Sequence, residues 1–449
     1  MKYLTENTSE MKLYLILINL FVVAFSFAQD SSIKVWSLQE CIDYALANNI
    51  TVKDAELDKN SAEVDYERVK SSRLPNLFGS ATQNLSNGSS IDPITSVFVL
   101  DQIYSTNVGL NSAMTLFQGN QINNQIKQNK LLLDQSISQE KVEKNNLVLS
   151  LLEIYLQALF SRESIAIAEN NLIASEKEVA RAKARLDAGT IALNDYTEAQ
   201  SQAATNKYNV ITSKNEYQQY IIDLKQLLEL PLNQDIEIAS INTDLGLVNL
   251  QIDKTKLYNK ALGFLPEIEA SNSNIAANEK ALDIAKGAYL PTLALTANVG
   301  TGYTSIRENT FSEQFDVNFN QRLGLSLSIP IFNRKETKAA VKTAMINIKK
   351  AEIQKQSTEK EVYKKIEIVY QNALSAEEQV NASEAAKTAA EQSYKLAQKK
   401  YELGDLSTTD LVISQNTFTN AQQTYLQAKY LHVLYYQLLQ FYQGNDINL

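Results

Sequence analysis

Apolar and small residues recur every three and four positions over two long stretches of the chain. The first stretch comprises Leu147, Leu151, Ile154, Ala158, Ser161, Ile165, Ala168, Leu172, Ser175, Val179 and Ala182. The second comprises Val362, Ile366, Val369, Ala373, Ala376 and Val380. A sustained period of about 3.5 residues is typical of a coiled-coil seam. A flanking stripe in the first stretch indicates that this helix has neighbours on two sides: Leu149, Leu152, Leu156 and Leu159.

Four other segments alternate with a period of two and are predicted to be strands, at about 77–85, 106–117, 293–300 and 323–331. In the last of them, Leu323, Leu325 and Leu327 alternate with Gly324 and Ser326. Alternation over about ten residues is typical of a barrel strand with one face toward lipid. A half-buried soluble sheet gives the same pattern. The polar segments Ser86–Ser105 and Thr304–Gln321 are predicted to be loops on the outside.

The chain is internally duplicated. Ala45-Leu46 recurs as Ala261-Leu262, and Leu74-Pro75-Asn76-Leu77 recurs as Leu290-Pro291-Thr292-Leu293. Such self-similarity at a fixed offset predicts repeated structural units. We therefore expect two repeats, 29–230 and 253–449, joined by a linker at 231–252. Each repeat is predicted to contain a helix, two strands, a long helix, a turn and a returning helix.

Residues that break helices are scarce, with 13 Gly and 6 Pro among 449 residues. Their positions predict two long helical arms, roughly Asn120–Ala188 and Arg334–Leu403, that end in turns near Gly189 and Gly404. At about 1.5 Å per residue, each arm would be about 100 Å long, which no compact core requires. The helix at about Ser37–Ser72 is expected to cover half of one arm.

Charge and rare residues exclude several function classes. The net charge of −9, from 51 acidic and 42 basic residues, argues against nucleic-acid binding. Cys41 is the only cysteine and His432 the only histidine, which excludes an intrachain disulfide and a histidine-rich zinc site and disfavours a Ser-His-Asp triad. The phosphate-loop motif Gly-x-x-x-x-Gly-Lys is absent. We therefore predict neither an enzyme nor a cofactor.

The N-terminus is predicted to be a signal peptide, 1–28. The apolar run from Leu13 to Phe27 follows Lys12 and ends in small residues before a cut after Ala28. The acidic stretch that precedes Met11 is unusual for a leader, and translation from Met11 is the alternative start. A membrane anchor is disfavoured because the run is short and no basic cluster follows it. No second run of 18 apolar residues follows.

The order of these features resembles the TolC-like outer membrane efflux protein family. The resemblance is carried by the opening segment 36–49 (WSLQECIDYALANN) and by the two turn segments, Arg185–Thr190 with Asp195 and Tyr401–Asp405 with Asp410. The implied fold is mainly α with a small β part, forming a trimeric α-helical barrel and a shared 12-stranded transmembrane β-barrel. Four strands per chain are too few to enclose a lumen, whereas three copies give an even number.

The resemblance also implies a location and partners. The chain would lie in the outer membrane of a Gram-negative bacterium, in contact with its lipid, with a helical tube in the periplasm. It would act as a passive exit duct for efflux or secretion, joined to a periplasmic adaptor protein and an inner-membrane transporter. The alternative is a secreted or periplasmic coiled-coil scaffold without a barrel. The duplicated strand pairs favour the channel, because a scaffold does not need them.

Acidic residues after each turn are the candidates for a gate. The resemblance places inward carboxylates at Asp195 and Asp410, and Glu198 follows Asp195 on the same helical face, where the second repeat has Ile413. Such a ring would favour cations. The alternative is a capping role at a helix N-terminus, and one residue can do both.

Basic residues before each turn, Arg181, Arg185 and Lys400, can either pair with the gate acids or complement a helix C-terminus. The turns themselves are the candidate contacts for the adaptor: Gly189, Thr190, Leu193, Gly404, Asp405 and Leu406.

Overall fold

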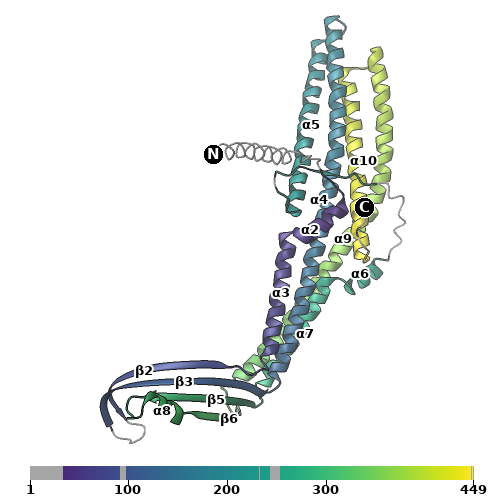
Figure 1. The fold of residues 1–449 in the computed structure, drawn as a ribbon. Helices are drawn as coiled ribbons and strands as arrows, with labels where there is room; N and C mark the ends of the chain where they lie inside the picture. The colour runs from purple at the N-terminus through teal and green to yellow at the C-terminus, as the bar shows by residue number, and fades with distance from the viewer. Residues whose placement is uncertain (1–33, 92–97, 232, 243–252, 446, 448–449) are drawn as a thin grey trace, which may run out of the picture.

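The computed structural model describes residues 34–91, 98–231, 233–242, 253–445 and 447. The predicted signal peptide lies outside these residues, as does the linker segment 243–252. The molecule is elongated, with helices stacked along one direction and a sheet that extends from one end of them (Figure 1).

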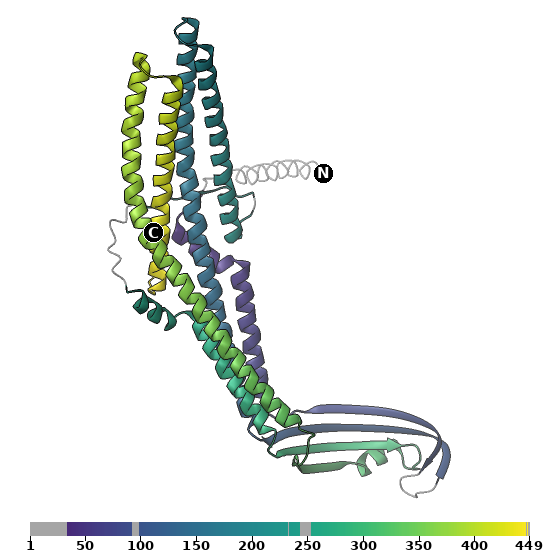
Figure 2. The ribbon, with the colours of Figure 1, turned by 180° about the vertical axis from the view of Figure 1, so that it is seen from behind.

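Four helices of the first repeat each have a counterpart in the second. The first repeat contains α2 (Leu38–Asn48), α3 (Ile50–Ser71), α4 (Gln121–Asp187) and α5 (Leu193–Leu227). The second repeat contains α6 (Lys254–Leu262), α7 (Pro266–Gly287), α9 (Glu336–Leu403) and α10 (Thr408–Tyr442). The α4–α5 and α9–α10 hairpins lie side by side at the end away from the sheet (Figure 2). The two long arms have 67 and 68 residues, in agreement with the predicted arms.

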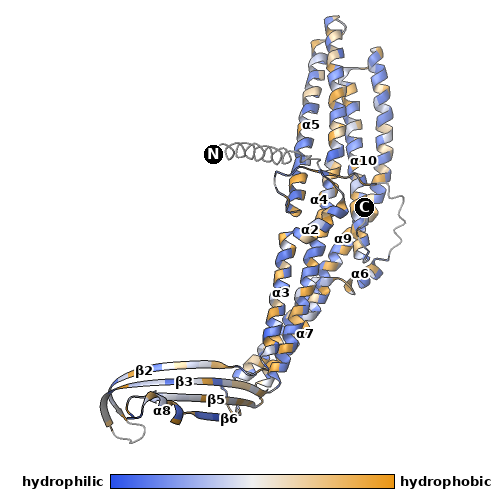
Figure 3. Ribbon diagram, viewed as in Figure 1, coloured by the Kyte–Doolittle hydropathy of each residue, from blue (hydrophilic) through white to orange (hydrophobic). Residues whose placement is uncertain are grey.

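Hydrophilic and hydrophobic residues are interspersed along all of the long helices (Figure 3). Within the described residues, no helix combines the length and the apolar character that crossing a membrane requires.

Most residues of the predicted seams are buried, and the others, Ile154, Ile165, Leu172, Val179 and Val380, are half-buried. On α4 the buried seam residues are Leu147, Leu151, Ala158, Ser161, Ala168, Ser175 and Ala182. On α9 they are Val362, Ile366, Val369, Ala373 and Ala376. Helix α4 packs against α5, α7, α3, α10 and α2. The prediction that this helix has neighbours on both sides is therefore confirmed.

The prediction of a single helix at Ser37–Ser72 is wrong, because the helix is interrupted at Asn49 and forms α2 and α3. The Asn49 side chain is only 4% exposed, and its oxygen accepts a hydrogen bond from the Thr51 N–H at 2.9 Å. Its Nδ2 donates to the Leu227 carbonyl oxygen at 3.0 Å. Asparagine is a strong N-cap, so this residue starts α3 while it also holds the C-terminal end of α5.

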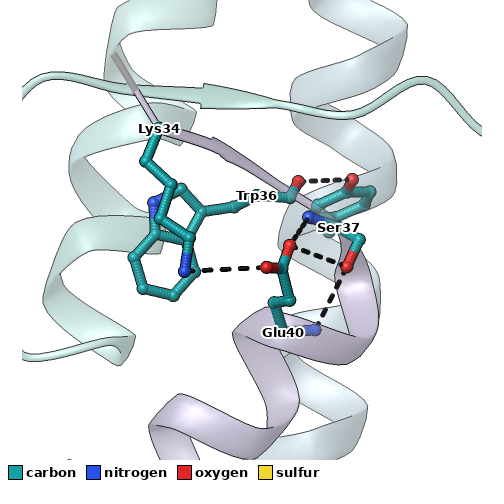
Figure 4. A network of polar contacts seen from close by, with 5 residues as sticks. Lys34, Trp36, Ser37 and Glu40 are labelled. Atoms are coloured by element: carbon teal, nitrogen blue, oxygen red, sulfur yellow. Dashed lines mark hydrogen bonds and ion pairs between the residues drawn. The ribbon is translucent and has the colours of Figure 1, made fainter. Parts of the chain in front are cut away.

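The start of α2 is fixed by a reciprocal capping box (Figure 4). The Ser37 Oγ accepts a hydrogen bond from the Glu40 N–H at 3.3 Å, and a Glu40 carboxylate oxygen accepts one from the Ser37 N–H at 2.9 Å. The hydrogen bonds that the Glu40 carboxylate accepts from the Ser37 N–H and from the Ser37 hydroxyl, the latter at 3.0 Å, lower the pKa of Glu40. The Lys34 Nζ lies 3.6 Å from Glu40 and 4.0 Å from the centroid of the Trp36 ring. The opening segment that carries the family resemblance therefore has a local structural role.

The large sheet has four antiparallel strands in the order β2-β3-β5-β6. They are β2 (Phe78–Ile91), β3 (Phe98–Gln118), β5 (Thr292–Thr304) and β6 (Asn320–Ser328). The ladder between β2 and β3 continues through the segment expected to be a loop, as far as Ile91 opposite Phe98. In the second expected loop, 311–317 forms the short helix α8 (Phe311–Val317). Strand β6 ends before Pro330, which cannot donate a ladder hydrogen bond.

A second, small sheet joins the N-terminal segment to the linker beside α4. Strand β1 (Lys34–Trp36) pairs in parallel with β4 (Ile236–Ile238). The Tyr155 hydroxyl of α4 lies 3.0 Å from the Trp36 carbonyl oxygen and 2.8 Å from that of Ala239. Arg162 donates to the Ile238 carbonyl oxygen at 2.6 Å. Both strands are thus fastened to the middle of the long arm.

The duplication extends to the backbone conformation. Apart from Gly88, every described residue with positive φ has a counterpart 215 positions away: Gly119 with Arg334, Asn120 with Lys335, Gly189 with Gly404, and Glu229 with Gly444. Each strand therefore enters its long helix through two consecutive left-handed residues. Because non-glycine residues adopt this conformation at a cost, its presence at Arg334 and Lys335 indicates that the junction geometry is required.

Gly119 differs from Gly189 in its surroundings, and this difference predicts unequal costs of substitution. A Cβ at Gly119 would lie 2.2 Å from the Gly287 carbonyl oxygen, whereas a Cβ at Gly189 would meet nothing within 4 Å. Gly189→Ala should lower the free energy of unfolding by about 1 kcal/mol, because alanine is strained in the left-handed backbone conformation. Gly119→Ala should lower it by about 3 kcal/mol, because the backbone at Gly287 must also move to make room for the Cβ. The unfolding temperatures of the two purified variants test this; equal shifts would contradict it.

Candidate functional site

The two hairpin turns lie at the end of the molecule farthest from the sheet (Figure 1). In the first, the Gly189 N–H donates to the Leu186 carbonyl oxygen and the Thr190 N–H to that of Arg185, both at 2.9 Å. With Gly189 at φ 71°, this is a Schellman motif, which satisfies carbonyl groups left free at a helix end. The glycine was predicted here for that reason.

The second turn closes in the same way. The Gly404 N–H donates to the Tyr401 carbonyl oxygen at 3.1 Å, and the Asp405 N–H donates to that of Lys400 at 2.9 Å. Around both turns the side chains are largely exposed, including Leu193 at 63% and Leu403 at 77%. Each turn therefore presents a rigid backbone and accessible apolar side chains at the tip.

Both acids that follow the turns make capping contacts. A carboxylate oxygen of Asp195 accepts a hydrogen bond from the Ala192 N–H at 3.2 Å. The Ser407 hydroxyl donates to the Asp410 carboxylate at 2.7 Å, and its oxygen lies 3.1 Å from the Asp410 N–H that donates to it. Glu198 lies one turn beyond Asp195 on α5 and is partly exposed. Because a carboxylate has about four acceptor positions, these contacts leave capacity for another role.

The basic residues near the turns do not contact these acids within one chain. Arg181 lies 3.3 Å from Glu178 and 3.6 Å from Glu402. The Arg185 guanidinium lies 5.3 Å from the centroid of the Tyr401 ring and donates to the Tyr401 carbonyl oxygen at 3.5 Å. Both arginines thus connect the first hairpin to the second. Lys400 is exposed and contributes its carbonyl oxygen to the second turn.

Tyr401 is the tip residue to which sequence reasoning assigned no role. It is 1% exposed, and its hydroxyl lies 3.4 Å from the Thr408 Oγ1, so it ties the end of α9 to the start of α10. Burial raises the pKa of its hydroxyl, which stays neutral at physiological pH. One feature of the sequence could have indicated this role. Tyr401 is aromatic where the first repeat has Leu186, three residues before the turn glycine.

Carboxamide side chains of the two hairpins meet below the tips, at Gln202 and Asn416. The Gln202 Nε2 of α5 donates to the Asn206 Oδ1 at 3.2 Å and to the Asn416 Oδ1 of α10 at 3.1 Å. The Asn206 Nδ2 donates to the Asn171 carbonyl oxygen of α4 at 3.2 Å. Net stabilisation by such bonds is small because water can replace the partner, so this contact separates more readily than an apolar one. No group of three acidic, His or Cys side chains among the described residues is arranged to hold a metal.

The large sheet has two faces of different character. On one face lie leucines and other apolar residues that are strongly exposed, such as Leu110 at 52%, Leu323 at 76% and Leu325 at 65%. The other face is lined by asparagine, serine, threonine and glycine. Since monomeric soluble proteins rarely expose so large an apolar surface, this face requires an apolar environment.

Comparison with known proteins decides the family. The model of the outer membrane efflux protein family matches residues 41–229 and 257–444, once in each repeat. The chain belongs to this family. It is accordingly an outer-membrane exit channel for efflux or secretion, with its helical tube in the periplasm.

Individual relatives agree with this assignment. The outer membrane protein TolC of Escherichia coli (strain K12) is 24% identical over 94% of this chain and 84% of its own length. The outer membrane efflux protein BepC of Brucella suis is 23% identical over 86% of this chain and 80% of its own length. The CmeC outer membrane channel of Campylobacter jejuni has the same fold, with a TM-score of 0.81 at 18% identity over 92% of this chain and 87% of that structure.

The contact between Arg185 and Tyr401 predicts that the first hairpin of the efflux protein stabilises the turn of the second. Arg185→Ala removes the group that covers the Tyr401 ring and should increase deuterium uptake in the second turn, at residues 401–408. Lys183→Ala is the matched control, because Lys183 pairs with Asp187 at 2.7 Å on its own helix and lies near Tyr196 of its own hairpin. Hydrogen exchange measures both variants. Equal uptake in the second turn would show that Arg185 does not hold it.

Proposed function

We propose that three copies of the chain assemble into one conduit, with a shared barrel of strands across the outer membrane and a tube of helices below it. The observation that carries this proposal is the two-faced sheet whose edge strands, β2 and β6, each pair with only one neighbour among the residues that the structure describes. A β6 edge can pair antiparallel with the β2 edge of the next copy, because the strand directions alternate across the sheet. Closure satisfies the open edges and gives twelve strands, an even number.

Exposed apolar residues on the helices support contact between copies. On α3, Ile50, Leu57 and Val64 are 65%, 65% and 68% exposed and are spaced by seven residues. On α9, Ile346 and Ile353 are 53% and 66% exposed with the same spacing. A seven-residue repeat of apolar side chains is the pattern of a helix that packs against a second helix along its length. Helices of the adjacent copy are the occupants that complete the tube.

The hairpin tips form the gate and the docking surface of this conduit. A periplasmic adaptor protein contacts the exposed turns at Gly189, Thr190, Leu193, Gly404, Asp405 and Leu406. An inner-membrane transporter supplies the energy, because the chain has no phosphate loop with which to hydrolyse a nucleotide. The carboxamide contact between the hairpins allows the second hairpin to shift at low cost.

Asp195, Glu198 and Asp410 supply the charge of the gate. Three carboxylates from each of three copies place nine around one aperture, which favours cations in passage and attracts multivalent cations as blockers. The hydrogen bonds that the carboxylates accept, from the Ala192 N–H at Asp195 and from the Ser407 hydroxyl at Asp410, hold these side chains in place at the helix starts. Asp195 and Asp410 thereby each serve both as a capping residue and as a charge of the gate.

The test is electrical. Wild-type protein reconstituted in planar bilayers should give discrete conductance steps with a preference for K⁺ over Cl⁻. Asp195→Asn combined with Asp410→Asn should weaken that preference and the block by multivalent cations severalfold, since the asparagine Oδ1 can still accept the hydrogen bond that the carboxylate accepts, and the substitution removes only the charge. Asp187→Asn is the control for a one-unit charge change, because Asp187 pairs with Lys183.

Two results would contradict these assignments. Absence of conductance from the wild-type protein would contradict the conduit itself. Unchanged selectivity in the double variant would leave Asp195 and Asp410 with a capping role alone.

A further inference from the structure

Charged residues are nearly absent from the large sheet. Among the residues of β2, β3, β5 and β6, only Asp101 and Arg322 are charged. Arg322 lies in β6, between the start of the strand at Asn320 and the apolar Leu323. A lone arginine in a strand whose opposite face meets lipid needs a polar environment on its own face.

The strand register places Arg322 in a row with two asparagines on the polar face. Asn111 of β3 is directly opposite Asn298 of β5, and Asn298 is directly opposite Arg322. The Asn298 Nδ2 donates to the Asn111 Oδ1, and the Asn111 Nδ2 donates to the Ser80 Oγ at 3.4 Å. Four adjacent strands therefore contribute one continuous polar row, with the guanidinium at its β6 end.

A hollow of about 510 Å³ lies beside this row, and its walls are uncharged over most of their extent. Its lining includes Ser80, Asn107, Asn111, Asn298, Asn318 and Asn320. Glycines create the space: a Cβ at Gly302 would lie 2.6 Å from the Asn107 Oδ1, and Gly109 lies opposite Gly300. The side chains around the hollow offer amide and hydroxyl groups, which donate hydrogen bonds to oxygen atoms of a ligand.

The other charged residues near the row lie in the loop between β5 and β6. Arg307, at the loop end of the hollow, donates to the Asn318 Oδ1 at 3.1 Å. The acids of that loop are Glu308, Glu313 and Asp316, and the Glu313 carboxylate is engaged by the Thr310 N–H at 3.0 Å as the cap of α8. Asp101 is opposite Gly88 in the ladder, ten residues along β3 from Asn111, which at about 3.3 Å per residue is about 33 Å away.

We propose that Arg322 and the asparagine row beside it form an anion-binding belt in the exit section of the conduit. Its ligand is a carboxylate or phosphate group of the passing cargo, which the planar guanidinium can bind through two parallel hydrogen bonds while the asparagine amides donate others. This inference rests on the proposed trimer, in which the polar face lines the lumen and three Arg322 side chains surround it. The belt is opposite in sign to the acidic ring at the hairpin tips, so the two ends of the conduit select independently.

The belt is tested with tripolyphosphate as the anionic probe. In planar bilayers, Arg322→Gln should shift the reversal potential in a KCl gradient toward that of a more cation-selective channel. It should also raise the tripolyphosphate concentration for half-block by about tenfold, the loss expected for one charge-assisted contact. Arg322→Lys should retain the selectivity. Arg68→Gln is the matched control, because Arg68 is exposed on α3 and pairs with Asp65 at 3.0 Å.

Labelling a cysteine at position 322 after assembly compares the same folded channel before and after a charge is added. In Arg322→Cys channels, a positively charged thiol reagent should return the reversal potential toward the wild-type value, and a negatively charged reagent should shift it further toward cation selectivity. The native Cys41 does not interfere, because it is fully buried and its thiol pKa is raised to about 12. Wild-type conductance with selectivity and block unchanged in both Arg322→Gln and the labelled channels would overturn the belt. Absence of any wild-type conductance would instead overturn the trimeric conduit.

Discussion

The structure depends on covering two helices that are about 100 Å long. No compact core can bury a helix of that length, so neighbours must follow it from one end to the other. Small residues make this possible on α4, where Ser161, Ala168, Ser175 and Ala182 are buried at seven-residue intervals and let adjacent helices approach closely. The half-length helices are stacked end to end along each arm, and the proposed trimer would cover the stripes that remain exposed.

The same constraint explains why the chain is duplicated and where its corners lie. One repeat supplies a long arm and part of its cover, and the second repeat supplies the rest. The junctions between strand and long helix share a backbone conformation and not the same side chains. The left-handed pair Arg334 and Lys335 matches Gly119 and Asn120 of the first repeat. The sheet begins at these junctions, so the membrane end and the periplasmic end of the conduit are joined by rigid helices through fixed turns.

Regular patterns in the sequence predicted most of the architecture. The heptad spacing located the seams, and the isolated Gly189 and Gly404 located the hairpin turns, because both signals are local. The break at Asn49 was missed because a capping asparagine inside a helical pattern resembles an ordinary polar position. The outer half of β2 was missed because its residues, rich in Asn, Ser and Gly, have the composition of a loop. The contact of Arg185 with Tyr401 joins residues 216 positions apart, which no local pattern reveals.

If three copies close one tube, a single chain is an incomplete part of it. The most direct measurement is the mass of the assembly extracted in mild detergent, determined by native mass spectrometry after the detergent is removed in the gas phase. We expect a species of three chains, held by the joined strand edges and by the heptad stripes on α3 and α9. A stable single chain or a pair of chains would contradict it, because neither closes a sheet of four strands per chain around a lumen.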